Sequence, residues 1–324
     1  MAEQHPDTRA RRSTPPEIDA GEIDAGEIDA GSRARTFRLS RRGFFGLSGG
    51  LFIAAACTSD GDGSGDASTT LPSPGGTANP EGLEAGVVSN DMYATERPQR
   101  FAFALTDTAG FASGPPATIT FTTGATDSET IDAPLNSEGL PEGRGLYVVE
   151  ASFPEAGTFD AVISVDGNDL PVVFQILEEA EALTPGEAAP VVPSATVLDT
   201  RDVDPICTLD PPCPFHELDL AEVTGSGKPV AVCFSTPARC QSRYCGPTLE
   251  LLVELGPEFD DVVDIIHVEV FRDSTTNQVA EPVDAYSLIS EPWMYALDGA
   301  GTITNRMGGA WDRGELRRFL ESTV

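Results

Sequence analysis

Two cysteines stand five positions apart in FSTPARCQSRYCGP, the stretch from Phe234 to Pro247. They follow an apolar run that predicts a strand and precede a run that predicts a helix. A thiol near a helix N-terminus is stabilised as thiolate by free backbone N–H groups, and Arg239 and Arg243 add positive charge around Cys240. The pattern predicts thiol/disulfide exchange, with Cys240 attacking, Cys245 resolving and Arg239 in support.

Three further cysteines lie nearby. Cys207 and Cys213 belong to the proline-rich stretch DPICTLDPPCPFHEL, where they favour a loop-closing structural disulfide. Metal binding is the rival, because His216 offers a third ligand. A fourth ligand is missing and the spacing matches no common zinc pattern, so no metal is assigned. Cys233 lies within an apolar run and is expected to be a buried, inert thiol.

The N-terminal residues 1–57 carry the features of an export signal. Arg41 and Arg42 precede an apolar segment that is too short to span a bilayer and ends in small residues. The paired arginines resemble the twin-arginine export motif, and Ala54 to Cys57 resembles a lipobox. This resemblance implies an extracytoplasmic protein anchored to the cell membrane by a lipidated Cys57. Cleavage without lipidation is the alternative. Export also implies an oxidising compartment, in which disulfides persist.

The formal net charge is −32. Such a field repels phosphate polyanions, which excludes nucleic acid as a partner. The acidic residues are spread along the chain, which favours solubility over an acidic patch for a cationic partner. Residues 58–82 are rich in Gly, Ser, Asp and Pro and have almost no large apolar residue, so they predict a flexible acidic tether.

The remaining chain predicts two domains, 83–178 and 200–324, joined by a linker over 179–199. The first contains short runs rich in β-forming residues, which predict an all-β antiparallel sandwich. The runs cover 100–107, 117–123, 145–153, 157–167 and 170–177. Glycine-aromatic openings such as the one at Gly145 resemble immunoglobulin-like modules of exported bacterial proteins. This domain is expected to be a spacer or docking module.

The second domain predicts an α/β order of βαβ followed by ββα. Asp312 and Glu315 predict a capping box at the start of the last helix. The order, the cysteine loop after the first strand and the proline before a later strand resemble the thioredoxin fold. The closest likeness is to exported thioredoxin-like proteins with a TPxFCxxxxCGP type of loop, although ordinary thioredoxins have two residues between their cysteines. The resemblance implies that Pro292 is the cis-proline that faces the active cysteines.

These features together favour a membrane-tethered thiol/disulfide oxidoreductase that needs no soluble cofactor and exchanges electrons with a protein dithiol or disulfide. Two alternatives stay open: a binding or scaffold module in which Cys240 and Cys245 form a structural disulfide, and a copper metallochaperone. Thioredoxin-fold copper chaperones use a cysteine pair and a histidine, and His267 would be that histidine. His267 and Glu269 share one face of a strand, where a satisfied polar pair is expected. The sequence does not indicate the oligomeric state.

Overall fold

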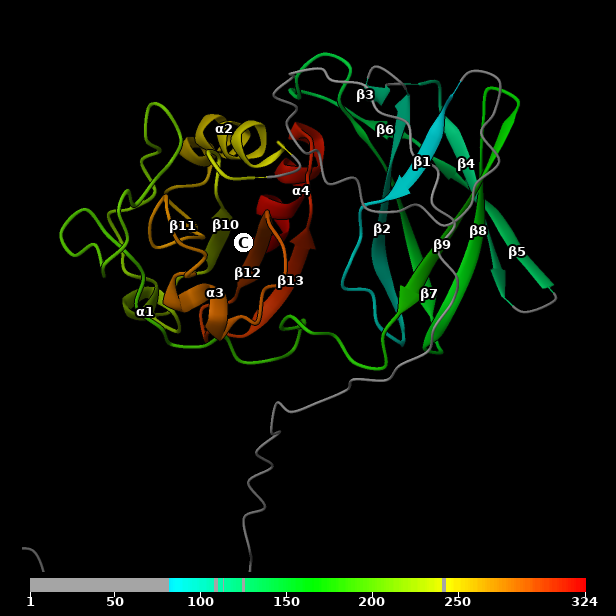
Figure 1. The fold of residues 1–324 in the computed structure, drawn as a ribbon. Helices are drawn as coiled ribbons and strands as arrows, with labels where there is room; N and C mark the ends of the chain where they lie inside the picture. The colour runs from blue at the N-terminus through cyan, green and yellow to red at the C-terminus, as the bar shows by residue number, and fades with distance from the viewer. Residues whose placement is uncertain (1–81, 108–109, 113, 124–125, 241–242) are drawn as a thin grey trace, which may run out of the picture. The chain divides into compact units, whose positions relative to one another are not determined.

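The computed structural model describes residues 82–107, 110–112, 114–123, 126–240 and 243–324. In this part the chain is mostly β-sheet with few helices (Figure 1). These described residues all belong to one compact unit. The export signal, Cys57 and nearly all of the tether lie outside the described residues, so these predictions stay predictions. No helix in the described part is long and apolar enough to cross a membrane.

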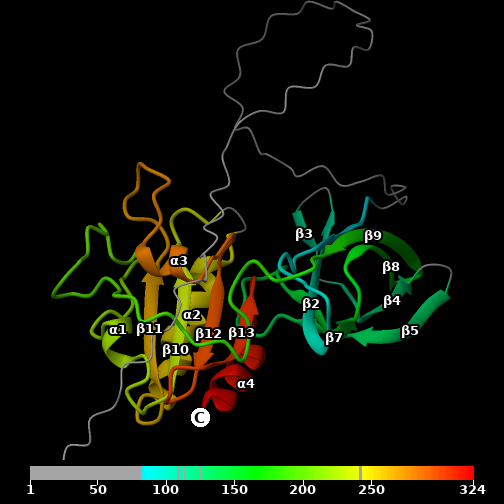
Figure 2. The ribbon, with the colours of Figure 1, turned by 90° about the horizontal axis from the view of Figure 1, so that it is seen from below.

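The first nine strands build two antiparallel sheets (Figure 2). The strands are β1 Glu84–Val87, β2 Thr95–Asp107, β3 Gly110–Ala112, β4 Ala117–Thr123, β5 Thr126–Ala133, β6 Leu135–Asn136, β7 Leu146–Phe153, β8 Gly157–Val165 and β9 Asn168–Ile176. One sheet has the order β1-β2-β7-β6, with β3 paired to β2, and the other has the order β5-β4-β8-β9. The five predicted strands are confirmed as β2, β4, β7, β8 and β9.

Aromatic side chains from both sheets meet in one core. Phe101 packs edge-on against Phe121 with ring centroids 5.0 Å apart, and Phe153 and Phe174 complete the cluster. In β9, which carries Phe174, every second side chain is buried, whereas residues 101–105 of β2 are all buried. The two-residue period therefore places the apolar side chains of the two sheets against one another.

The other elements form an α/β part. They are α1 Leu220–Val223, β10 Val230–Ser235, α2 Cys245–Leu255, the 3-10 helix η1 Gly256–Glu258, β11 Asp264–Glu269, α3 Glu281–Ala285, β12 Trp293–Leu297, β13 Ile303–Gly308 and α4 Arg313–Thr323. The sheet order is β11-β10-β12-β13. Strands β10 and β11 are parallel, whereas β12 is antiparallel to both β10 and β13. The predicted order of strands and helices is confirmed.

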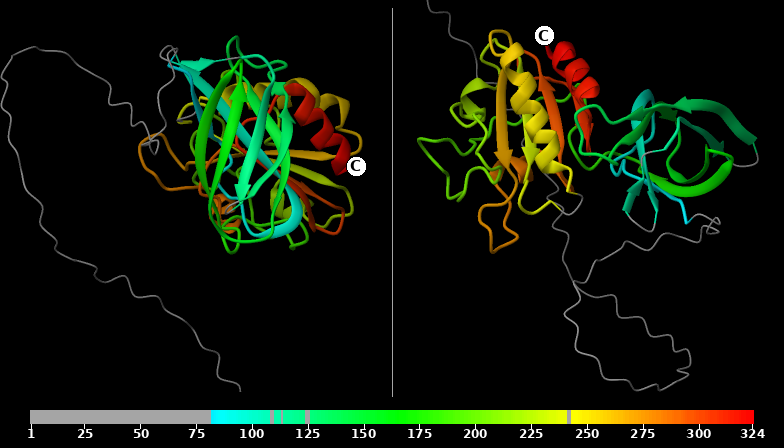
Figure 3. Two further views of the ribbon diagram at one scale, coloured as in Figure 1. Left: turned by 90° about the vertical axis from the view of Figure 1, so that its right-hand side faces the viewer. Right: turned by 90° about the horizontal axis from the view of Figure 1, so that it is seen from above.

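Side chains of β10 alternate between two apolar cores. Ala231 and Cys233 pack with leucines of α2 and α4, which lie side by side over one face of the sheet (Figure 3). Val232 and Phe234 pack into the core of the opposite face, together with residues of α1 and α3. The cysteine loop leaves the sheet where β10 ends and enters α2.

The segment 179–199, predicted as a linker, is packed against the α/β sheet. Ala182, Ala189 and Val192 are buried in the same core as Phe234. The segment also hydrogen-bonds to β13, because Ile303 donates its N–H to the carbonyl of Glu187 at 2.9 Å. Its Ala and Val side chains bury apolar surface, which keeps the segment against the sheet despite its prolines.

The predicted capping box at α4 forms only in part. Asp312 is the N-cap and accepts the Glu315 N–H at 2.8 Å. The Glu315 carboxylate does not reach back to the cap; it makes a two-pronged ion pair with Arg100 of β2 instead. A charged partner from a distant strand therefore replaces the local hydrogen bond that a capping box requires.

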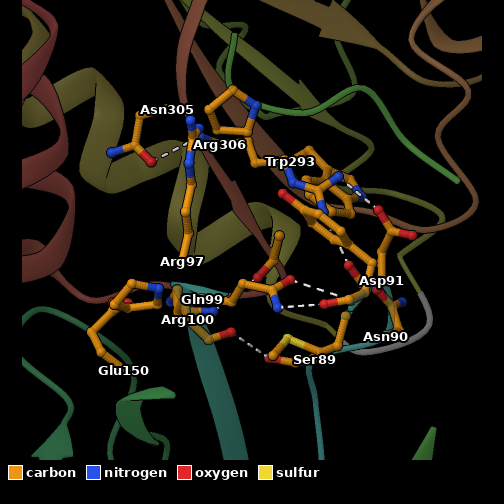
Figure 4. A pocket seen from close by; sticks show the side chains of 15 residues that line it. Ser89, Asn90, Asp91, Arg97, Gln99, Arg100, Glu150, Trp293, Asn305 and Arg306 are labelled. Carbon is orange, nitrogen blue, oxygen red and sulfur yellow. Dashed lines mark hydrogen bonds and ion pairs between the residues drawn. The ribbon is translucent and has the colours of Figure 1, made fainter. Parts of the chain in front are cut away.

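A second ion pair joins residues that are far apart in the sequence. Arg306 of β13 contacts the Asp91 carboxylate at 2.6 Å, and the Asp91 side chain is fully buried. Arg306 also lies over the rings of Tyr93 and Trp293, each 5.3 Å from its guanidinium carbon. Figure 4 shows these side chains on the wall of a pocket. The Asp91 carboxylate and the Arg306 guanidinium therefore pair with each other, although both residues line the pocket.

Candidate functional site

Cys240 and Cys245 lie at the N-terminus of α2. Cys245 is the first residue of the helix, and its backbone N–H donates to the Cys240 sulfur at 3.4 Å. Upstream, the Cys240 N–H donates to the Thr236 carbonyl at 3.0 Å, which folds the loop back toward the end of β10. Cys240 keeps 8% of its surface exposed and Cys245 keeps none. No disulfide joins the two sulfurs in this structure.

The helix N-terminus gives the two thiols different properties. The first turn of α2 carries unpaired N–H groups and the positive end of the helix dipole, which favour a thiolate at Cys240. The pKa of Cys245 is raised well above its usual range, first by its side-chain hydrogen bond to Cys240 and then by burial. The difference suits an attacking sulfur at Cys240, which keeps a small exposed surface, and a fully buried resolving sulfur at Cys245.

Arg239 faces away from the pair, toward the loop after β11. Its guanidinium donates to the carbonyls of Asp273 and Thr276 and to the Asn277 side chain, and it lies over the Phe271 ring. These contacts anchor the cysteine loop to the loop after β11 and leave the predicted support of Cys240 by Arg239 a prediction. A residue of the sandwich reaches the same loop: Arg144 donates to the carbonyl of Arg243 at 2.7 Å.

Glu291 and Pro292 complete this site. The Glu291–Pro292 peptide is cis and directly precedes β12. A Glu291 carboxylate oxygen and the sulfurs of Cys240 and Cys245 all lie within 4.8 Å of one another. Burial and the charge of Cys240 raise the pKa of Glu291 to about 7, while Arg239 acts in the opposite direction. Sequence reasoning singled out Pro292 and missed Glu291, although the two are neighbours.

We expect Glu291 to accept the proton that Cys245 must lose before it attacks. Because its pKa is raised to about 7, Glu291 is neutral below that pH and becomes a carboxylate above it. In a mixed disulfide the Cys240 sulfur carries no charge, so burial alone raises the pKa of Glu291, and the rate of resolution should rise with pH through an inflection below about pH 7. Glu291→Gln should remove this inflection and slow resolution about 100-fold, the lower range of general-base effects. Stopped-flow measurements between about pH 5 and 9 test this.

The conservative variant Glu291→Asp provides the matched control, because it keeps a carboxylate near the sulfurs. It should retain an inflection, shifted and with a lower plateau. An unchanged pH profile in Glu291→Gln would show that the proton leaves by another route.

The second cysteine pair lies in a separate cluster. Cys207, Cys213 and His216, from the loop before α1, meet His267 of β11, and all four are buried. The Cys207 and Cys213 sulfurs are 3.8 Å apart, and both residues are thiols in this structure. The predicted disulfide between them, whose S–S bond would measure about 2.05 Å, is not formed here and stays a prediction.

His267 belongs to this cluster. Its Nδ1 lies 3.3 Å from the Cys213 sulfur, and its Nε2 lies 2.9 Å from the Ser235 hydroxyl. The copper alternative needs His267 beside Cys240 and Cys245, and the structure groups it with the other cysteine pair. The prediction that His267 and Glu269 share a strand face is consistent with their neighbours, because Ile266 and Val268 pack in the opposite core.

Hydrogen bonds of Thr208 connect the cluster with the loop that carries Cys240. Thr208 donates its N–H and its hydroxyl to the Glu269 carboxylate at 2.8 and 2.9 Å. The Thr208 hydroxyl oxygen in turn accepts the N–H of Ala238 at 3.1 Å. Burial raises the pKa of Glu269, partly offset by its hydrogen bonds. These hydrogen bonds therefore hold the loop from Cys207 to Cys213 against Ala238, two residues before Cys240.

Cys233 of β10 belongs to neither group of candidate ligands, although it lies in the same apolar core as Cys207 and Cys213. It is fully buried, and burial raises its pKa to about 12. A thiol that stays protonated and out of reach of solvent is a poor nucleophile. The structure therefore agrees with the expectation that Cys233 is inert.

No family model and no curated protein matches this chain. Solved structures that resemble parts of it include the exposed lipoprotein thioredoxin Etrx1 of Streptococcus pneumoniae, at 16% identity over 32% of this chain and 90% of that chain, with a TM-score of 0.27. Another is a candidate thiol:disulfide interchange protein DsbE of Chlorobium tepidum, at 11% identity over 44% of this chain and 99% of that chain, with a TM-score of 0.32. A third is the Lin-41 filamin domain, at 16% identity over 29% of this chain and 92% of that chain, with a TM-score of 0.21. These low scores establish neither fold nor function.

Proposed function

We propose that this protein is an extracytoplasmic thiol/disulfide oxidoreductase, tethered to the membrane by a lipidated Cys57, that exchanges disulfides through Cys240 and Cys245. One observation carries the proposal: the Cys240 sulfur accepts the first N–H of α2 and lies beside the partly buried Glu291 carboxylate and the Cys245 thiol. This arrangement supports the roles of Cys240 as stabilised thiolate, Cys245 as resolving thiol and Glu291 as proton acceptor.

We further infer that the α/β part is a thioredoxin-fold domain and that the sandwich is immunoglobulin-like. The parallel β10–β11 pair, the antiparallel β12–β13 hairpin and the sheet order support the first assignment. Two packed antiparallel sheets support the second. The four residues between Cys240 and Cys245 lengthen the loop relative to ordinary thioredoxins, yet Cys245 still begins the helix.

The exchange follows from these positions. The Cys240 thiolate attacks one sulfur of a substrate disulfide, so a bond to Cys240 forms, the substrate S–S bond breaks and the second substrate sulfur leaves as a thiolate. Cys245 then gives its proton to Glu291 and attacks the Cys240 sulfur. The Cys240–Cys245 disulfide forms and the first substrate sulfur leaves. Two electrons pass from the dithiol of the protein to the substrate, and the same steps run in reverse when the protein starts oxidised.

A redox titration of the full chain tests this function. Differential alkylation across graded dithiol buffers, with peptide mass mapping, gives each cysteine pair and its potential. We expect a Cys240–Cys245 disulfide that exchanges above about −300 mV, since structural disulfides of exported proteins lie lower. A lower potential for this pair, or pairing of Cys240 with Cys207 or Cys213, would favour the scaffold alternative.

A further inference from the structure

We propose that Cys207, Cys213, His216 and His267 bind one zinc ion in a closed tetrahedral site. Four ligand atoms, two sulfurs and two nitrogens, lie within 4.8 Å of one another. The four residues are at most 7% exposed. Two cysteines and two histidines make one of the common ligand sets of structural zinc, and the fourth ligand comes from a strand 51 positions after His216.

The distances between ligand atoms fit a single zinc ion. Zn–S bonds of about 2.3 Å and Zn–N bonds of about 2.05 Å in a regular tetrahedron place sulfurs about 3.8 Å apart, sulfur and nitrogen about 3.6 Å apart and nitrogens about 3.3 Å apart. The Cys207 and Cys213 sulfurs are 3.8 Å apart. Three of the four sulfur–nitrogen distances are 3.3, 3.3 and 3.7 Å, and the two nitrogens are 3.1 Å apart. The agreement is within about 0.3 Å, close to the tolerance of a metal site.

Hydrogen bonds alone do not account for this convergence. His267 Nδ1 is approached at once by both cysteine sulfurs and by His216 Nε2. A ring nitrogen has one proton to donate or one lone pair to accept with, so it cannot satisfy three neighbours. A cation shared by all four groups satisfies each of them, which avoids the cost of burying unpaired polar atoms.

The surroundings prepare the ligands for a metal. His267 Nε2 lies 2.9 Å from the Ser235 hydroxyl and 3.2 Å from the Ser235 carbonyl, so its proton is held there and the Nδ1 lone pair faces the cluster. The Cys207 sulfur accepts the Cys213 N–H at 3.4 Å, which stabilises a thiolate. Partners of this kind fix the orientation and the tautomer of ligands in metal sites.

The ligand set also indicates the metal and its role. Tetrahedral S₂N₂ coordination favours zinc, whereas a two-iron cluster with two histidines would place the pairs of ligands on separate irons. Four buried protein ligands leave no position for water or substrate, so the ion would be structural. It would hold the 207–216 loop against β11 and, through Thr208 and Ala238, support the loop that carries Cys240. Zinc and a Cys207–Cys213 disulfide exclude each other, because the metal requires both thiolates.

Metal binding to the reduced full chain tests the proposal. The protein, freed of metal with a chelator under reducing conditions, is titrated with Zn²⁺ and with Co²⁺. We expect one equivalent of either ion, the intense visible spectrum of tetrahedral Co²⁺ with thiolate charge transfer, and X-ray absorption of the zinc form that shows two sulfur and two nitrogen ligands. The absorption measurement uses the unaltered chain, so it decides the ligand set even if a variant fails to fold.

Variants locate the ion. Losing a residue that hydrogen-bonds to a metal ligand typically weakens metal binding roughly 10–100-fold, and Cys213→Ser, which removes a ligand, should weaken it more. Ser235→Ala should weaken zinc binding about tenfold, because the Ser235 carbonyl still accepts from His267. The double variant Cys240→Ser, Cys245→Ser is the matched control and should bind zinc normally. Lack of zinc binding by the reduced chain, uptake of Cu(I) but not Zn²⁺, or loss of zinc in the control variant alone would overturn the proposal. The control also separates this site from the exchange site, whose failure would leave zinc binding intact.

Discussion

The variant Cys245→Ser is expected to stop the reaction halfway, whereas Cys240→Ser should abolish it. With reduced full chain and oxidised glutathione as a small disulfide probe, Cys245→Ser should accumulate a glutathione adduct on Cys240, because the attacking thiolate remains and the resolving thiol is gone. Cys240→Ser should lower the rate of exchange to that of buffer alone. Peptide mass mapping of the trapped adduct, together with the rate of glutathione release, measures both effects.

The structural basis is the difference between the two sulfurs. Cys240 keeps 8% of its surface exposed and accepts the first helical N–H. Cys245 is fully buried, and its hydrogen bond to Cys240 raises its pKa. A substrate sulfur can therefore reach Cys240 first, and Cys245 can reach only a sulfur already attached to Cys240. Removing one or the other interrupts different steps.

Cys233→Ala is the matched control for this experiment. It removes a fully buried thiol that lies outside the exchange pair and outside the second cluster, and it should leave exchange and adduct formation unchanged. An adduct on Cys207 or Cys213 in the Cys245→Ser variant would contradict the assignment of Cys240. Full turnover in Cys245→Ser would show that a second substrate thiol performs the resolving step.

The proposed exchange pair could be singled out from the sequence because its signals are local. The apolar run of β10, the two cysteines and the helix that follows are contiguous, and Cys245 is found at the first position of α2. The sandwich strands β2, β4, β7, β8 and β9 were equally predictable, because they are short runs rich in β-forming residues, and in β9 every second residue is buried. Strand β5 was missed since its sequence TDSETIDA carries few apolar side chains.

Features that depend on distant contacts could not be predicted. His267 meets Cys207 and Cys213 because their loop lies along β11, where the His267 N–H donates to the Phe215 carbonyl at 3.0 Å. Glu315 leaves its predicted cap because Arg100, more than two hundred positions away, offers a stronger partner. The spacing of residues along the chain does not indicate either contact, so the sequence analysis did not identify His267 as the fourth ligand of the proposed zinc site.

Removing the charge of Asp91 is expected to destabilise the protein by about 3–5 kcal/mol, the usual cost of leaving a buried ionic partner uncompensated. The Asp91 side chain is fully buried, and the Arg306 side chain is 10% exposed. Asp91 also accepts the N–H groups of Glu181 and Ala182 at 2.8 and 3.2 Å. Asp91→Asn keeps the size of the side chain and removes its charge, and urea unfolding measures the loss.

Two further variants separate charge from packing. Asp199→Asn breaks an exposed ion pair with Arg201, whose side chains are 62% and 45% exposed, and it should cost no more than about 1 kcal/mol. The double variant Asp91→Asn, Arg306→Met should recover much of the stability lost in Asp91→Asn, because it also removes the buried cation. If the double variant is no more stable than Asp91→Asn, the loss comes from broken contacts and not from charge. If Asp91→Asn loses no more stability than Asp199→Asn, the buried Asp91–Arg306 pair does not stabilise the protein.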